Sequence, residues 1–174
     1  PMNRSMDGRR ALGLIGDIRK KLPHVALRTS LVVGFPGEGR KEFAALKAFV
    51  AEARFDHLGV FTYSPEEGTA SFPRGDPVPE EEKCARKDEI MQLQAGISAE
   101  INRKYVNQRI EILVENPVRV GRQRRFGRAR FQAPEVDGVV YLQEDSRAAA
   151  RLKPLEKVEI TAADVYDLHG KTVR

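Results

Sequence analysis

The sequence is poor in cysteine and lacks long apolar runs, and both deficits narrow the classes of protein to which it can belong. Its 174 residues contain one cysteine, Cys84, which excludes an internal disulfide, a multi-cysteine zinc site and a self-contained iron–sulfur cluster. A lone free thiol is typical of a reducing compartment, so we expect a cytoplasmic location. No stretch approaches the ~20 consecutive apolar residues of a membrane span, and the polar, basic residues 1–10 do not resemble a signal peptide.

The positive charge of the chain is modest in sum but concentrated in one segment. The formal net charge is +5, from 30 basic and 25 acidic residues. Residues 119–130 contain six arginines and no acidic residue. Arginines with Phe126 and Phe131 among them are typical of surfaces that neutralise phosphates and stack bases. The alternative is a strand hairpin whose charged face is merely solvated.

The first third of the chain predicts alternating helices and strands. Apolar residues recur at helical spacing over residues 12–22, with Asp7 as N-cap and Pro23 as terminator. Residues 25–33 are rich in β-branched residues and predict a buried parallel strand, which the glycines of 34–37 end. A helix over residues 43–53 and a strand over 58–63 follow. This order predicts part of an α/β parallel sheet or barrel.

The remainder predicts a loop, a long helix and a small β-barrel. Residues 64–79 hold four prolines and two glycines, which predicts a long loop. Pro79 and three glutamates then open a helix that reaches Tyr105. About five short strands follow, and they predict a closed OB-like barrel. These strands are expected at residues 109–115, 126–131, 138–142, 157–160 and 165–173.

Several motifs resemble the MiaB/RimO methylthiotransferase family of radical-SAM enzymes. They are LRTSLVVGFPGE (residues 27–38), FDHLGVFTYSPEEGT (55–69), MNR (2–4) and IMQLQAGISAEINR (90–103), together with residues 109–173. The resemblance implies an α+β protein of two domains: the C-terminal part of a TIM-like radical-SAM barrel (1–78), a linker helix (79–105) and a TRAM domain (106–174). The GVFTYSPEEGT and APEVDGVVY segments are similar to the RimO branch, which modifies an aspartate of a small-subunit ribosomal protein. The alternatives are a MiaB-type tRNA adenosine methylthiotransferase fragment and a non-catalytic RNA- or protein-binding module.

The GFPGE segment is the candidate cofactor site, because it joins the end of a strand to the start of a helix. Backbone N–H groups there suit a polar ligand, and the carboxyl ends of parallel strands face the active site of a barrel. The resemblance implies contacts to S-adenosylmethionine from Arg28, Gly34, Phe35, Pro36, Gly37, Glu38 and Tyr63. It also implies [4Fe–4S] clusters in the full-length enzyme. The CxxxCxxC motif of the family is absent from this sequence, so we expect no metal site or tightly bound cofactor on this chain and no catalysis by the chain alone.

The arginine segment is the candidate surface for the macromolecular substrate. We expect contacts from Arg122, Arg124, Arg125, Phe126 and Arg128. The expected partner is the small-subunit ribosomal protein, with RNA as a second ligand of the TRAM domain. A half-barrel exposes an open sheet edge, which predicts self-association. No residue is assigned to catalysis.

Overall fold

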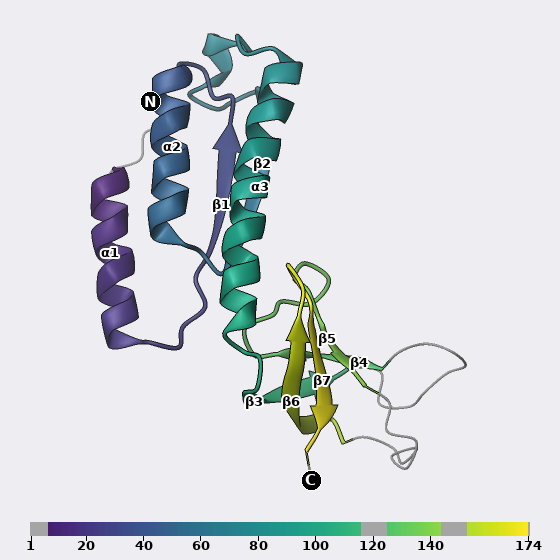
Figure 1. Ribbon diagram of the computed structural model, residues 1–174. Helices are drawn as coiled ribbons and strands as arrows, with labels where there is room; N and C mark the ends of the chain where they lie inside the picture. Colours follow the sequence, from purple (N-terminus) through teal and green to yellow (C-terminus); the bar gives the residue numbers. More distant parts are fainter. Residues whose placement is uncertain (1–6, 116–124, 144–152, 174) are drawn as a thin grey trace. The chain divides into compact units, whose positions relative to one another are not determined.

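The computed structural model describes residues 7–115, 125–143 and 153–173 (Figure 1). The chain divides into two compact units, and the division falls within one helix, between Ile97 and Ser98. The first unit combines helices with a small parallel sheet, and the second is a closed β-barrel. The mixed α+β fold predicted from the sequence is confirmed.

The first unit follows the predicted order of elements. Its elements are α1 (Gly8–Lys21), β1 (Arg28–Val33), α2 (Arg40–Ala53), β2 (His57–Thr62), a 3₁₀ turn at Phe72–Arg74 and α3 (Glu80–Arg103). Asp7 is the N-cap of α1 as predicted, since its carboxylate accepts a hydrogen bond of 2.8 Å from the N–H of Arg10. The first strand is shorter than predicted and begins at Arg28, after an irregular stretch. The loop before α3 contains the 3₁₀ turn.

The two strands of the first unit pair in parallel, with α2 as the connection between them. Val33 and Val60 are buried on one face of this sheet. The opposite face contains Val32 and its register partner Phe61, whose exposed fraction is 59%. The sheet therefore has one packed face and one open face. Both strands also have an outer edge without a partner strand among the described residues.

Side chains of α1 and α3 donate hydrogen bonds to backbone carbonyls at the junction between α2 and β2. The Arg19 guanidinium of α1 donates to the carbonyls of Ala53 and Arg54 at 2.6 and 2.7 Å, where α2 ends. A cation at this position complements the dipole of α2. The amide nitrogen of Gln94 in α3 donates to the carbonyl of Phe55 at 2.8 Å. The apolar core around these contacts consists of Val33, Val50, Ala53, Phe55, Val60, Tyr63, Ile90 and Ile97.

The second unit contains five strands in a closed barrel of order β3-β4-β5-β7-β6. They are β3 (Arg109–Val114), β4 (Phe126–Ala129), β5 (Val140–Leu142), β6 (Leu155–Ala163) and β7 (Leu168–Thr172). The last strand, β7, lies between β5 and β6 and runs parallel to β5. The predicted five-stranded barrel is confirmed, although β6 extends beyond the predicted residues 157–160 because it pairs with both β3 and β7.

Two glycines inside the strands of the barrel allow neighbouring strands to approach closely. A Cβ at Gly170 would lie 2.3 Å from a methyl carbon of Val158, and one at Gly127 would lie 2.5 Å from the carbonyl oxygen of Leu113. The interior is apolar and well buried, as alternation of the strand residues requires. It consists of Ile112, Val114, Ala129, Val140, Leu142, Val158, Ile160 and Leu168.

Candidate functional site

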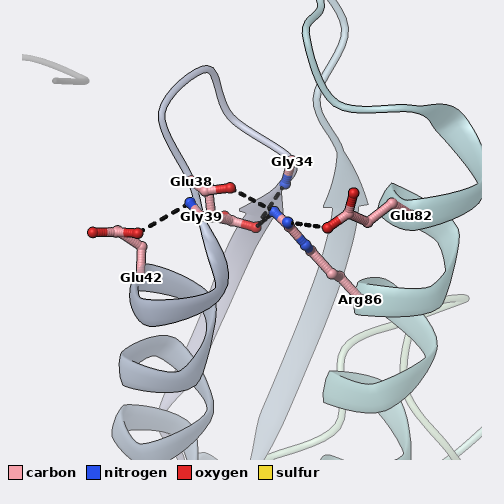
Figure 2. A network of polar contacts seen from close by, with 6 residues as sticks. All are labelled: Gly34, Glu38, Gly39, Glu42, Glu82 and Arg86. Carbon is pink, nitrogen blue, oxygen red and sulfur yellow. Dashed lines mark hydrogen bonds and ion pairs between the residues drawn. The ribbon is translucent and has the colours of Figure 1, made fainter.

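The GFPGE segment forms a tight loop between β1 and α2, as the sequence predicted. Gly34 and Gly37 have φ angles of +77° and +96°, which L-residues other than glycine rarely adopt. The N–H of Glu38 donates to the carbonyl of Phe35 at 2.8 Å and closes a turn within the loop. The Glu38 carboxylate folds back and accepts the N–H of Gly34 at 3.0 Å (Figure 2). The first and last residues of the loop are thus bonded to each other.

Only part of the backbone of this loop is available to a ligand. The N–H groups of Gly34, Glu38 and Gly39 already donate within the protein, the last of them to the Glu42 carboxylate at 3.0 Å. Among the described residues, no acceptor contacts the N–H of Phe35 or of Gly37. The space where a Cβ of Gly37 would point is open to at least 4 Å. These two N–H groups are therefore the donors that the loop can offer.

Tyr63 follows β2 directly and lies beside the loop. Its ring meets that of Phe35 edge-on, with centroids 5.2 Å apart and planes inclined by 74°. The exposed fraction of Tyr63 is 7%, and its hydroxyl is buried without a hydrogen-bond partner in the described part of the chain. A buried polar group without a partner is costly and needs an explanation. The loop and Tyr63 therefore provide three polar groups without a partner in the described residues: the N–H groups of Phe35 and Gly37 and the Tyr63 hydroxyl.

Arg86 of α3 reaches the loop and binds it in two places. One guanidinium nitrogen donates to the Glu38 carboxylate at 2.7 Å and to the Glu38 carbonyl at 2.8 Å, and the other bonds to Glu82. Figure 2 shows Arg86 extending from α3 between the two glutamates. Burial opposes the charge of Arg86, but the hydrogen bonds to Glu38 and Glu82 outweigh this effect and raise the pKa of the guanidinium. The guanidinium also lies 5.5 Å from the centre of the Phe43 ring.

Lys83, one turn earlier in α3, is the most completely buried charged residue that the structure describes. Its side chain is 2% exposed, and its ammonium contacts the Tyr63 carbonyl at 3.0 Å, Asp76 at 2.8 Å and Glu80 at 2.6 Å. The hydrogen bonds to Asp76 and Glu80 raise the pKa of Lys83 above its ordinary value of 10.5, because they outweigh desolvation. The aliphatic stem of Lys83 also packs against Gly34, because a Cβ at Gly34 would lie only 2.2 Å from Cγ of Lys83. Sequence reasoning assigned no role to Lys83 or Arg86.

The other predicted cofactor residues are placed as follows. Pro36 is buried within the loop, beside Phe35 and Gly37. Arg28 is the first residue of β1, whereas the loop begins after the last one, Val33. At about 3.3 Å per strand residue, Arg28 lies roughly 20 Å along the strand from Gly34. The structure therefore brings together the loop and Tyr63, and Arg28 lies at the other end of the sheet.

The arginine segment is only partly described. Arg122 and Arg124 lie outside the described residues. Arg125 is 7% exposed, and Phe126, the first residue of β4, is half-buried. Arg128 bonds to the Glu115 carboxylate and donates to the carbonyl of Gln132 at 3.0 Å. A partner that contacts Arg128 would have to share it with these two oxygens.

The described residues contain neither a candidate metal site nor a helix that could span a membrane. Within residues 7–115, 125–143 and 153–173, no group of three or more histidine, cysteine or acidic side chains could hold a metal ion. No helix in the same ranges combines the length and the apolar character needed to cross a membrane. Cys84 is exposed, and its sulfur lies 3.7 Å from a carboxylate oxygen of Glu80.

The barrel matches a known domain family, and nearly the whole chain is similar to a group of known proteins. Residues 106–173 match the family model described as "TRAM domain". A protein of Aquifex aeolicus named "Ribosomal protein uS12 methylthiotransferase RimO" is 44% identical over 98% of this chain. The chain is a homologue of the RimO methylthiotransferases. RimO proteins of Desulfitobacterium hafniense and Thermosynechococcus vestitus are 43% and 47% identical over 99% and 90% of the chain.

The match to RimO covers nearly all of this chain but a minor part of each relative. The chain spans 39%, 38% and 34% of the lengths of these three RimO proteins. The resemblance stated from the GFPGE, SPEEGT and APEVDG segments is confirmed, including the choice of the RimO branch.

Proposed function

We propose that this chain is the C-terminal part of a radical-SAM methylthiotransferase that adds a methylthio group to the β-carbon of an aspartate in ribosomal protein uS12. In this proposal, residues 1–78 complete the barrel that binds S-adenosylmethionine, residues 79–105 are the linker helix and residues 106–174 dock the substrate. The observation that carries it is the identity of 42–47% to RimO proteins over nearly the whole chain. The chain alone is not catalytically competent.

The loop after β1 supports a role in binding S-adenosylmethionine. The two free N–H groups, of Phe35 and Gly37, and the unpartnered Tyr63 hydroxyl suit the polar atoms of this ligand. When bound, S-adenosylmethionine supplies the reductive-cleavage chemistry of this enzyme class. Iron–sulfur clusters take cysteine thiolates as ligands, and Cys84 is the only cysteine of the sequence. The residues present here therefore do not fit a cluster, and the proposal places the [4Fe–4S] clusters on parts of the enzyme outside this chain.

The barrel is proposed as the docking domain for the substrate protein. The arginine segment, with Arg122, Arg124, Arg125, Phe126 and Arg128, is the proposed contact surface, and its six arginines without an acid favour an anionic partner. Ribosomal protein bound to rRNA would present both carboxylates and phosphates to these arginines. RNA is therefore a second proposed ligand of the same domain, and the proposed location is the cytoplasm.

The test of this function uses the full-length protein with reconstituted clusters, S-adenosylmethionine and a reductant. The substrates are purified uS12, uS12 within small ribosomal subunits, and total tRNA. We expect mass spectrometry to find one methylthio group on an aspartate of uS12 and none on tRNA. Modification of a tRNA adenosine instead would establish the MiaB-type alternative. Binding of RNA or protein without any modification would establish a non-catalytic module.

The open edges of the two-stranded sheet support a separate proposal about the chain by itself. Because β1 and β2 pair only with each other in the described residues, their outer backbone groups can pair with another copy. We expect residues 1–174, expressed alone, to sediment partly as dimers or larger species. The full-length protein, with further strands on these edges, should sediment as a monomer, and a monomeric fragment would refute this proposal.

A further inference from the structure

Two buried cations of α3 have no part in the function proposed so far. Lys83 and Arg86 have exposed fractions of 2% and 6%. Burying a charge costs several kcal/mol unless carboxylates or other acceptors pair with it. A helix that needed only to pack on the sheet would place apolar side chains here. The contacts of these two residues therefore indicate what the burial achieves.

Arg86 fixes the loop after β1 through Glu38. One carboxylate oxygen of Glu38 accepts both the Arg86 guanidinium and the N–H of Gly34, at 2.7 and 3.0 Å (Figure 2). The Glu38 side chain is only 11% exposed, so water offers little replacement for Arg86. Without Arg86, a nearly buried carboxylate would lose its charge partner, and the loop would open at the residues that flank its free N–H groups.

Lys83 fixes the other side of the same site. Its ammonium donates to the Tyr63 carbonyl at 3.0 Å, at the end of β2, and to the Asp76 carboxylate in the following loop. Tyr63, which Lys83 holds by its carbonyl, also carries the buried hydroxyl that has no hydrogen-bond partner among the described residues. Lys83 and Arg86 are three residues apart and thus neighbours on one face of α3. One helical turn therefore holds both segments that the proposed cofactor would contact.

We propose that Lys83 and Arg86 are positioning residues for the bound cofactor. They hold the loop of residues 34–38 and the end of β2 at the separation at which the N–H groups of Phe35 and Gly37 and the Tyr63 hydroxyl together meet S-adenosylmethionine. This inference rests on the proposed function and adds to it a role for α3. The helix that leads to the TRAM domain thereby becomes part of the cofactor site.

The test compares variants of the full-length protein with reconstituted clusters. Arg86→Met and Lys83→Met remove the charge and keep most of the volume, and Arg86→Lys restores a charge at the same place. Glu38→Gln keeps an acceptor for the Gly34 N–H and removes the charge that pairs with Arg86. The matched control is Lys47→Met, because Lys47 also links α2 to α3, through Glu89 at 2.6 Å, and also lies near Phe43, at 5.8 Å, but does not contact the loop.

The measurements are the dissociation constant of S-adenosylmethionine, by equilibrium dialysis, and the hydrogen exchange of the loop amides without ligand. We expect Arg86→Met and Lys83→Met each to raise the dissociation constant about tenfold, equivalent to ~1.4 kcal/mol. Arg86→Lys should recover part of the loss, and Glu38→Gln should weaken binding. Exchange at Gly34 should accelerate in Arg86→Met, and Lys47→Met should bind as the parent does.

Three outcomes would overturn the inference, and one of them also bears on the function. If the parent binds S-adenosylmethionine and both methionine variants bind it equally well, only the positioning role is refuted. If Lys47→Met loses as much affinity as Arg86→Met, the effect is general docking of α3 and the positioning role is again refuted. If the parent itself does not bind S-adenosylmethionine, the proposed function fails, and the inference fails with it.

Discussion

The substitution Gly34→Ala tests how closely the loop and α3 fit together. The alanine methyl group would lie 2.2 Å from Cγ, 2.6 Å from Cδ and 3.3 Å from Cβ of Lys83. These atoms belong to the stem of a side chain whose ammonium is held by the Tyr63 carbonyl and two carboxylates. Lys83 therefore cannot move aside without breaking those contacts. Gly34 also has a φ of +77°, which adds a conformational cost for alanine.

The two costs can be separated by a second glycine of the same loop. Gly37→Ala has a comparable φ, +96°, but its methyl group would meet nothing within 4 Å. The conformational cost alone is about 1–2 kcal/mol, so this is the loss of unfolding free energy expected for Gly37→Ala. Overpacking against a well-packed neighbour costs about 1–3 kcal/mol more, so Gly34→Ala should lose roughly 2–5 kcal/mol.

The assay is urea unfolding of the parent, the two single variants and the double variant Gly34→Ala/Lys83→Ala. Because Lys83→Ala removes Cγ and Cδ, the double variant should lose less free energy than the sum of the two single losses. The non-additivity should be about 1–3 kcal/mol, a size typical of residues in direct contact. Equal losses for Gly34→Ala and Gly37→Ala, with an additive double variant, would refute the fit between Gly34 and Lys83.

Three further predictions concern charge, barrel closure and helix propensity. Because the pKa of Lys83 is raised in the folded state, its stabilising contribution is complete below about pH 10 and lost as the pH rises through the raised value. The difference in unfolding free energy between the parent and Lys83→Met should therefore be constant up to about pH 10 and shrink at higher pH, and a difference that stays constant above that pH would contradict it. Gly170→Ala, whose methyl would meet Val158 at 2.3 Å, should lower the melting temperature of the barrel, which far-ultraviolet circular dichroism of the variant can measure. Gly13→Ala in α1, where the methyl meets nothing within 4 Å, should instead stabilise the first unit by about 0.5–1 kcal/mol in the same urea assay.

Most of the element order followed from periodicity and from the positions of glycine and proline. Asp7, the glycines of the loop and Pro79 mark chain reversals or helix ends, where local chemistry dominates, and the structure places a cap, a loop and a helix start at these points. The barrel followed from alternation, because its strands bury every second residue. The extra length of β6 did not, because it depends on pairing with two strands distant in the sequence.

The buried face of α3 shows why the site was only half predicted. Apolar residues at helical spacing mark this helix only from Ile90 onwards. Extended backwards at the same spacing, this stripe continues through Arg86 to Lys83, and Gln94 lies between Ile90 and Ile97 on the same face. Polar residues at buried helix positions have a partner that lies elsewhere in the sequence, here Glu38, Tyr63 and Phe55. If charged residues at the same helical spacing are included, the sequence predicts that Lys83 and Arg86 lie on the buried face. It does not predict which residues they contact.

The place of β7 in the barrel also has a consequence for the order of events during synthesis. Leu168–Thr172 is the last of the five barrel strands to leave the ribosome, yet it lies between β5 and β6. At about 5–20 residues per second, synthesis takes several seconds to proceed from β3 to β7. During this time the four earlier strands have an opening between β5 and β6. During that interval the unpaired backbone of both strands is open to a neighbouring nascent chain or a chaperone. A chain truncated before Leu168 would therefore have a barrel that cannot close.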